Sequence, residues 1–350
     1  MTVSSFEEEA SQYRFAAPCA SATIDWPESF GTRFTLFVDT EEEFDWSGPF
    51  RRSARDTTAA AALPEFHQRF FEREIPVAYL IDHPIATDPA AIDAMRALLE
   101  SDPRSTVGTQ LHPWVNPPFE EPVSERNSFA GNLPQSLEAA KLTNLTETIE
   151  QTFGIRPIIY RAGRYGLGPH TLGMLEALGY RIDSSMRAAY DFRHIQGPDY
   201  SAVGNDAFRT GPSGSLIELP LTTVFTGHAR GAGRWLHPLA QRMPFGGALA
   251  RLGMLSRIAL TPEDMPLDEV MEAIRVALGE GVRVLNFSYH SPSLVPGHTP
   301  YVRDESDLAE FHRWWDCVLD LLDRLSVRPA SIDDLVTAAE PAPQSGLPTA

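Results

Sequence analysis

From Arg33 onward, short apolar segments alternate with segments of helical periodicity, and this alternation constrains the fold more than any other feature. The apolar segments are rich in β-branched and aromatic residues, which is typical of buried strands. Few hairpin turns separate them, so we expect a parallel sheet in an α/β fold. The expected strands cover residues 34–38, 75–82, 105–112, 155–161, 180–184, 215–221 and 282–289. About seven parallel strands favour a (β/α) barrel, closed or nearly so, over an open doubly wound sheet.

The chain is expected to hold one domain between two extensions. Residues 1–30 lack clear periodicity and are interpreted as an N-terminal arm, with Trp26 and Phe30 pinning its end to the core. Residues 31–340 are expected to form the single barrel domain, and the Pro- and Ala-rich residues 341–350 a flexible tail. Residues 227–260 hold five arginines in a Gly-interrupted stretch, which we interpret as a helical insertion with a solvated basic face rather than an anion site.

Composition narrows the functional classes. The net charge of −18 and the pI of about 4.9 argue against non-specific binding of nucleic acid or anionic membranes. The two cysteines, Cys19 and Cys317, lack the spacing of a metal site or a disulfide framework, which fits a reducing compartment. No apolar run approaches about 18 residues, and Met1–Ala10 is acidic, so we expect no membrane span, no secretory signal and a cytoplasmic location.

The first expected strand runs directly into acidic residues. If the chain stays extended, Asp39 and Glu41 point to one side and Thr40 to the other. Two neighbouring carboxylates suit a divalent metal ion, or a general base beside a metal ligand. The other acids of this stretch are interpreted as a solvated loop: Glu42, Glu43 and Asp45.

Polar residues also end other expected strands, namely His112, Arg161, Asp183 and His290. In a parallel barrel these ends share one rim, where active sites of such folds lie. Each residue alone has a structural alternative, such as a packed histidine, an ion-pair partner or a turn-bonding aspartate. Their repetition at successive strand ends favours a site. His83, which ends the second strand, and His298, in a loop, are weaker candidates.

Carboxylates with imidazoles form a ligand set suited to Zn²⁺, with Co²⁺ and Mn²⁺ as alternatives. Such a metal lowers the pKa of its bound water and polarises a carbonyl group. A nearby carboxylate can accept the water's proton, and a histidine on the opposite side can protonate the leaving group. The residue types therefore indicate metal-assisted hydrolysis of an amide or ester, with an Arg–Asp pair holding the base. No GxSxG motif and no activated cysteine compete with this prediction.

Four segments resemble one known family in its motif order: FTLFVDTEEEFDW, VGTQLHPWVNPPFEE, YRAGRYGLGPHTLGMLEALGYRIDSSMR and NFSYHSPSLVPGHTPYVRDESDL. They are similar to NodB-homology polysaccharide deacetylases, carbohydrate esterase family four, and most of all to the WalW-type branch. The resemblance covers roughly residues 33–326. It implies a distorted (β/α) barrel and a carbohydrate or small acylated substrate.

The resemblance also implies roles for single residues. Asp39 matches the general base, and Glu41 stands near the place of the family's metal-binding aspartate. His112 matches one metal histidine, but Gln110 and Trp114 occupy places where a second might be expected. Arg161 and Asp183 match the family's supporting residues. His290 matches its general acid.

The expected activity is removal of an acetyl or other small acyl group from an N-acylated sugar or saccharide precursor. Trp114, Phe119 and Tyr165 are candidates for stacking on a sugar ring. Because Gln110 is a poor zinc ligand, three alternatives stay open: metal held by Glu41, His112 and a further group such as Asp39 or His83, hydrolysis without metal, or lost catalysis. The rival functions are an inactive barrel that binds saccharide or a partner, and hydrolysis of a small non-sugar amide.

Overall fold

The computed structural model describes residues 13–241 and 253–340. Its strands are β1 Arg33–Thr40, β2 Val77–Ile81, β3 Thr106–Leu111, β4 Ile159–Ala162, β5 Ile182–Asp183, β6 Phe208–Thr210, β7 Leu216–Glu218, β8 Thr223–Thr226, β9 Ser256–Ala259, β10 Val284–His290 and β11 Arg328–Pro329. Its α-helices are α1 Leu63–Phe71, α2 His83–Thr87, α3 Pro89–Ser101, α4 Gln135–Phe153, α5 Thr171–Leu178, α6 Gly233–Gln241, α8 Leu267–Gly279, α9 Glu305–Arg324 and α10 Ile332–Ala339.

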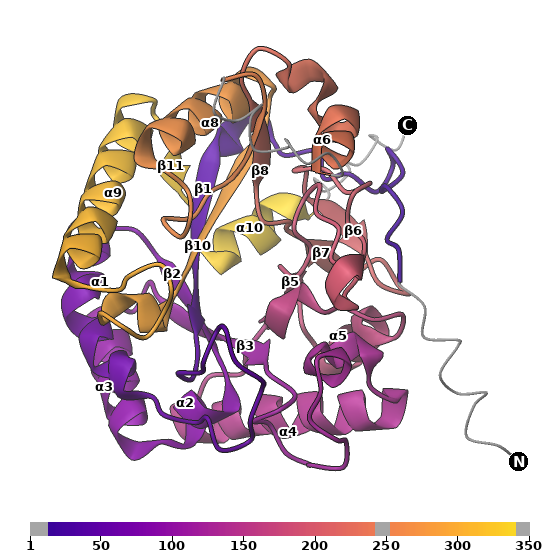
Figure 1. The fold of residues 1–350 in the computed structure, drawn as a ribbon, viewed down its shortest axis with the longest axis vertical. Helices are drawn as coiled ribbons and strands as arrows, with labels where there is room; N and C mark the ends of the chain where they lie inside the picture. The colour runs from indigo at the N-terminus through magenta and orange to yellow at the C-terminus, as the bar shows by residue number, and fades with distance from the viewer. Residues whose placement is uncertain (1–12, 242–252, 341–350) are drawn as a thin grey trace, which may run out of the picture.

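A curled nine-stranded sheet forms the centre, in the order β10-β1-β2-β3-β4-β5-β7-β6, with β11 paired to β1. The run from β10 to β7 is parallel throughout, and only β6 runs antiparallel to its neighbour. Helices α1, α3, α4, α5, α8 and α9 lie around the outside of this sheet (Figure 1). The predicted distorted barrel of about seven parallel strands is therefore confirmed.

The two faces of β1 show how the barrel is filled. Leu36 and Val38 belong to the large core between sheet and helices, and both are buried. Phe37 belongs to a second core cluster formed by inward-facing strand residues. Because side chains alternate along a strand, Asp39 follows Phe37 on the inner face. The sequence places a carboxylate at the inner, carboxyl-terminal end of a central strand.

The barrel is not closed by a strand ladder between β10 and β7. Instead, Asn286 of β10 donates its side-chain amide to the backbone oxygens of Leu219 and Pro220, at 3.1 and 3.3 Å. The Thr222 hydroxyl accepts the backbone N–H of Asn286 at 2.9 Å. These side-chain contacts satisfy polar groups that an open edge would leave exposed.

The N-terminal segment packs against the barrel from residue 13 onward. Trp26 and Phe30 stack with ring centroids 4.8 Å apart and are nearly buried. Both belong to the inward-facing core cluster, together with Ile332 and Leu335 of α10. The expectation that Trp26 and Phe30 pin this segment is met. Residues 1–12 and 341–350 lie outside the described residues.

The expected helical insertion at residues 227–260 is only partly helical. Helix α6 falls within it, but its end forms β9, which pairs antiparallel with β8. This correction has a physical reason: Val224 pairs with Ile258, and both side chains are buried, so tertiary packing selects a strand there. Residues 242–252, with Arg242 and Arg251, lie outside the described residues.

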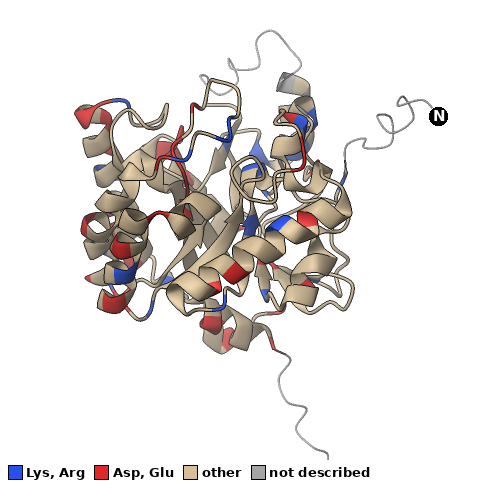
Figure 2. Ribbon diagram, turned by 90° about the horizontal axis from the view of Figure 1, so that it is seen from below, with Lys and Arg blue, Asp and Glu red and all other residues tan. Residues whose placement is uncertain are grey.

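Charged residues are interspersed over the outer helices, with Asp and Glu more frequent than Lys and Arg (Figure 2). Within the described residues, none of the helices combines the length and the apolar character needed to cross a membrane.

Candidate active site

Asp39 and Arg161 form a buried ion pair at the inner rim of the barrel. Arg161 Nη1 donates to Asp39 Oδ1 at 2.6 Å, and both side chains are 1 % exposed. The guanidinium is held from a third strand, because its Nε donates to the Ser184 backbone oxygen at 2.9 Å and its Nη2 to the Ser184 hydroxyl at 3.1 Å. Arg161 thereby fixes one oxygen of Asp39 and leaves the other directed elsewhere.

The second oxygen of Asp39 faces His290 of the neighbouring strand. Asp39 Oδ2 and His290 Nε2 are 3.6 Å apart, and the two residues are partners in the β1–β10 register. On its other side, His290 Nδ1 contacts Glu263 Oε2 at 2.6 Å, and its backbone N–H donates to Glu263 Oε1 at 3.0 Å. Ser293 also donates its hydroxyl to Glu263, at 2.6 Å. The imidazole is therefore oriented between two carboxylates.

This arrangement sets the protonation state of His290. Burial by itself lowers the pKa of the imidazole, but the negative charges of Glu263, Glu41 and Asp39 and the hydrogen bond that the imidazole donates to Glu263 raise it well above its ordinary value. The surrounding carboxylates therefore favour the protonated form of His290. A charged imidazole beside a carboxylate that faces a cavity is a suitable proton donor.

Glu41 and His112 lie side by side next to Asp39. His112 Nε2 is 3.5 Å from Glu41 Oε2, and both residues are buried. Burial raises the pKa of Glu41 to about 8. The second oxygen of Glu41, Oε1, is buried without a hydrogen-bond partner, and so is Oε1 of Gln110. Two buried oxygens without hydrogen-bond partners, next to an imidazole, are groups that a bound cation would satisfy.

Glu42 supports His112 from behind, which corrects its assignment to a solvated loop. It is fully buried, and its Oε2 contacts His112 Nδ1 at 2.8 Å. Its Oε1 accepts the indole N–H of Trp114 at 2.7 Å. The chain turns inward here because the backbone N–H of Glu42 donates to the buried carboxylate of Asp82 at 2.7 Å. Because Nδ1 of His112 contacts a carboxylate, the ring hydrogen belongs on Nδ1. The electron pair of Nε2 is then available to bind a cation.

Glu42, Asp82 and His112 offer donor atoms within 4.8 Å of one another. This buried cluster could hold a metal ion on its own. However, the Asp82 oxygens already accept the backbone N–H groups of Glu42 and Ile85, and both Glu42 oxygens contact N–H-bearing atoms. The unsatisfied oxygen of Glu41 lies on the other side of His112, so we favour that side for an ion. Glu42 and Asp82 then serve to hold His112 in place.

Asp183 lies near Arg161 but does not pair with it among the described residues. It accepts a hydrogen bond from the Ser185 hydroxyl and is the register partner of Glu218. Burial of this carboxyl pair raises the pKa of both members. The expected Arg–Asp pair is thus formed by Arg161 with Asp39, and Asp183 lies beside Glu218 instead.

The rim encloses a cavity of about 330 Å³, here called the main cavity. Asp39, Glu41, Gln110, His112, Arg161 and His290 contribute its polar wall. Six aromatic residues also line it, Phe44, Trp46, Phe50, Tyr165, Phe192 and Tyr301, together with Ala162, Arg164, Arg187 and Ile195. The volume is that of a small-molecule site.

Two of the three expected stacking residues do not line this cavity. Trp114 is 2 % exposed and stacks on His112 with ring centroids 4.4 Å apart, so its faces are covered. Phe119 lies at the surface under the cations of Arg52 and Lys141. Tyr165 does line the cavity. Trp46, whose ring centroid is 5.0 Å from that of His290, takes the position expected of a stacking residue.

The weaker histidine candidates lie outside the main cavity wall. His83 begins α2, and its Nδ1 contacts Arg55 Nη2 at 3.2 Å. Burial and this positive charge lower the pKa of His83 to about 4. His298 forms an ion pair with Glu43 at 3.1 Å. Glu43 also accepts hydrogen bonds from Thr58 and Ala59, so it fastens the acidic loop instead of lying free in solvent.

Lys141, the only lysine of the chain, fixes the loop that follows His112. Its side chain is fully buried, and its ammonium donates to the backbone oxygens of Pro113, Asn116 and Pro118 at 3.0, 2.6 and 2.7 Å. It also pairs with Glu121 at 3.1 Å. The loop position of Trp114, and through it that of Glu42, depends on this cation.

Comparison with solved structures identifies the architecture. A protein assigned as a polysaccharide deacetylase from Mycobacterium smegmatis aligns over 91 % of this chain and 93 % of its own, with 15 % identity and a TM-score of 0.50. A polysaccharide deacetylase from Pseudomonas aeruginosa aligns over 89 % and 92 %, with 12 % identity and a TM-score of 0.50. The fold is that of the polysaccharide deacetylases. The Puue allantoinase shares it, over 89 % and 91 %, with 14 % identity and a TM-score of 0.51.

At these identities the comparisons establish the deacetylase fold alone. No protein-family model and no curated protein sequence matches the chain.

Within this deacetylase fold, sequence reasoning missed Glu263, Glu42 and Asp82. Glu42 carried a usable signal, since it directly continues a strand whose inner end is buried. Asp82 directly follows β2, just as Asp39 lies near the end of β1. Only its neighbour His83 was a candidate in the sequence analysis. Glu263 carried no local signal, because it lies in a loop and meets His290 only through the path of that loop.

Proposed function

We propose that this protein is a hydrolase of non-peptide C–N bonds that removes an acetyl or other small acyl group from an N-acylated sugar or saccharide precursor. The observation that carries the proposal is the placement of Asp39, held by Arg161, 3.6 Å from His290 at the wall of a small cavity. We further propose, from the sequence motifs, that the chain belongs to the WalW-type branch of NodB-homology deacetylases.

The two groups divide the proton transfers of amide hydrolysis. Asp39 accepts a proton from the attacking water, because its Oδ2 faces the cavity side while Arg161 binds Oδ1. His290 gives its proton to the nitrogen of the leaving amine, which would otherwise leave as an unstable anion. Glu263 keeps His290 oriented and charged. Asp183, behind Arg161, supports the position of the base.

The residues fit a divalent metal ion on the cavity side of His112. Glu41 and His112 would hold it, with Asp39 near by, and the unsatisfied oxygens of Glu41 and Gln110 both point to an absent cation. An amide oxygen is a poor zinc ligand, but it suits harder ions such as Mn²⁺. When bound, the ion would activate water and polarise the acyl carbonyl group. Zn²⁺ remains the first candidate, with Co²⁺ and Mn²⁺ as alternatives.

The Glu41→Gln variant is expected to lose metal. Removing a direct ligand should weaken binding by more than the roughly 10–100-fold that loss of an outer-shell partner costs. Equilibrium dialysis with Zn²⁺, Co²⁺ and Mn²⁺, followed by elemental analysis, measures this without any activity assay. Glu43→Gln is the matched control, because Glu43 contacts Thr58 and His298 instead. Equal metal content in both variants would contradict the assignment.

The function itself is tested by incubating purified protein with N-acetylated mono- and oligosaccharides and each of the three metal ions. Released acetate is expected with at least one ion. No release with any ion, together with no bound metal, would reject the proposal and favour a barrel that only binds saccharide or a partner. A Gln110→His variant that gains both metal and activity would support that alternative.

The Glu263→Gln variant is expected to be most impaired at alkaline pH. Glu263 raises the pKa of His290, so the neutral amide should lower it, and the imidazole would then lose its proton at lower pH. The alkaline limb of the kcat/KM profile should shift towards acid, with activity at pH 8 reduced by about tenfold or more. A uniform loss at all pH values would instead indicate a purely structural role. Glu263→Asp should restore part of the profile.

A small non-sugar amide is the second candidate substrate. The main cavity measures about 330 Å³ and has an aromatic wall, so a compact amide would fill it as well as one sugar ring. Assaying short-chain amides and cyclic ureides in parallel with the saccharides distinguishes the two, because only one substrate class should saturate the enzyme.

A further inference from the structure

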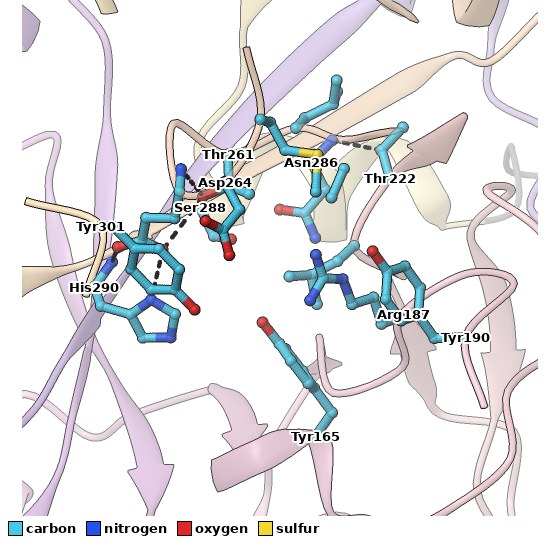
Figure 3. Close-up of a pocket in the computed structure, with 15 residues that line it drawn as sticks. Tyr165, Arg187, Tyr190, Thr222, Thr261, Asp264, Asn286, Ser288, His290 and Tyr301 are labelled. Carbon is cyan, nitrogen blue, oxygen red and sulfur yellow. Dashed lines mark hydrogen bonds and ion pairs between the residues drawn. The ribbon is translucent and has the colours of Figure 1, made fainter. Parts of the chain in front are cut away.

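A second cavity adjoins the main cavity behind His290. It measures about 190 Å³, and Tyr165, Arg187, His290 and Tyr301 line both cavities. We call it the side chamber. Figure 3 shows Arg187 and Tyr190 on one wall, His290 and Asp264 on the opposite one, and Tyr165 between them. A substrate whose acyl group lies at Asp39 can therefore extend past His290 into the side chamber.

Arg187 is the unexplained group of this chamber. Its Nε is buried without a hydrogen-bond partner, and in the described parts of the chain no carboxylate lies within ion-pair distance of its guanidinium. Its guanidinium carbon lies over aromatic faces, 4.1 Å from the ring centroid of Tyr190 and 5.4 Å from that of Tyr165. A guanidinium carries five N–H donors suited to carboxylate or phosphate, and here they are unused.

A second cation lies beside it. The guanidinium carbon of Arg257 is 3.6 Å from the same Tyr190 ring, and its Nη1 donates to the backbone oxygen of Ala189 at 3.1 Å. Arg257 also makes no ion pair with any described carboxylate, although acids outnumber bases 47 to 29 in the chain. Two like charges sharing one ring repel each other unless an anion lies between or beside them. The expectation of a solvated helix face is therefore wrong for Arg257, which belongs to β9 and is half-buried.

Backbone strain is concentrated at the same place. Seven described residues other than glycine have positive φ. Two of them line the side chamber, Tyr165 and Asp264, with φ of 62° and 61°, and Arg164, with φ of 56°, lines the main cavity. Such conformations persist where the surrounding structure imposes them, often at ligand sites. The backbone of the wall that carries Tyr165 and Arg187 thus includes strained conformations.

Among the described residues no acid of the chamber forms an ion pair with Arg187, although the charge of Glu263 favours the charged guanidinium. Both Glu263 oxygens are engaged by His290 and Ser293. Asp264 is exposed, and its carboxylate stands across the cavity from Arg187 (Figure 3). Asp264 would disfavour an anion by its charge but is screened by solvent.

We propose that Arg187, with Arg257 behind Tyr190, binds an anionic group of the substrate, a carboxylate or a phosphate, in the side chamber. This inference rests on the proposed function and makes the substrate an acidic acylated molecule, such as an N-acylated sugar acid or sugar phosphate. Arg187 would set specificity and position the acyl group at Asp39 without taking part in proton transfer.

The first test uses anions alone, so it does not depend on catalysis. Inorganic phosphate and acetate are titrated into the full-length protein at constant ionic strength, and binding is followed by calorimetry and tyrosine fluorescence. Saturable binding of at least one anion is expected, weakened by about tenfold or more in Arg187→Gln. The exposed Arg275→Gln on α8 is the matched control and should bind like the wild type. Asp264→Asn should bind the anion more tightly. No saturable binding, or equal binding by Arg187→Gln, would overturn the proposal.

The second test distinguishes the two anions on a substrate-like scaffold. N-acetylglucosamine, its 6-phosphate and the corresponding uronic acid are compared as ligands of the wild type and of Arg187→Gln. The preferred charged ligand should bind at least about tenfold more tightly than the neutral sugar in the wild type only. Equal loss of neutral and charged ligands in the variant would indicate a collapsed cavity and overturn the assignment. Failure of acetate release with intact anion binding would reject the proposed hydrolysis and leave the anion site standing.

Discussion

Asp39→Asn is expected to abolish hydrolysis, with kcat/KM reduced by about 10³-fold or more. The amide cannot accept a proton from water, and it removes the anion that Arg161 neutralises at 2.6 Å. Steady-state assays of acyl release measure the effect. Activity within a few-fold of the wild type would show that Asp39 is not the base and that the site works differently.

The same substitution leaves Arg161 buried and unpaired, which is itself destabilising. Unfolding must therefore be measured in parallel, so that loss of activity is compared at a temperature where the variant is folded. Asp45→Asn is the matched control, because Asp45 lies in the same acidic stretch but is exposed and bonds only its own turn. An activity loss in Asp39→Asn alone would also exclude the inactive-barrel alternative.

Lys141→Met is expected to lower the free energy of unfolding by about 3–5 kcal/mol. The methionine fills a similar volume, but it removes the closer of the two cations that pair with the buried Glu121, leaving only Arg52 at 3.7 Å, and it leaves three loop carbonyls without this donor. Urea unfolding followed by fluorescence measures the change. Gln151→Met, at an exposed position of the same helix, should change stability by less than about 0.5 kcal/mol. Similar stability of both variants would contradict a structural role for the lysine.

Because Lys141 is the only lysine, chemistry offers an independent check. An amine-reactive reagent should modify the folded chain at the N-terminus alone, and Lys141 only after denaturation, since its side chain is 0 % exposed. Rapid modification of Lys141 in the folded protein would show that the loop after His112 opens readily.

Much of the fold could be predicted because its signals are local. The apolar strand segments located β1 to β5, β7 and β10 within a few residues. β6, β8, β9 and β11 were missed because pairing with a partner strand defines them more than their own sequence does. Short strands carry too few residues for a period to emerge, so pairing decides them.

The acidic stretch after β1 shows where sequence reasoning ends. Alternation along an extended strand determined that Asp39 and Glu41 share the inner side, because the two-residue period of a strand is a property of the backbone alone. That Glu42 turns inward as well was decided by Asp82, a residue of another strand whose carboxylate binds its N–H group. The sequence shows that Glu42 and Asp82 are both present, but it does not show that they lie close together in the fold.

By itself, the sequence determined the parallel barrel and the rim positions of Asp39, His112, Arg161 and His290, since strand ends follow from local hydrophobic patterns. Only the tertiary structure decided which of these groups are partners. Glu263 reaches His290 through a loop, and Arg187 meets Arg257 over Tyr190 across two separate segments. Charged groups pair through space over a few ångströms. The paths of the loops and the register of the strands therefore decide which groups pair, and no local sequence pattern shows these paths or this register.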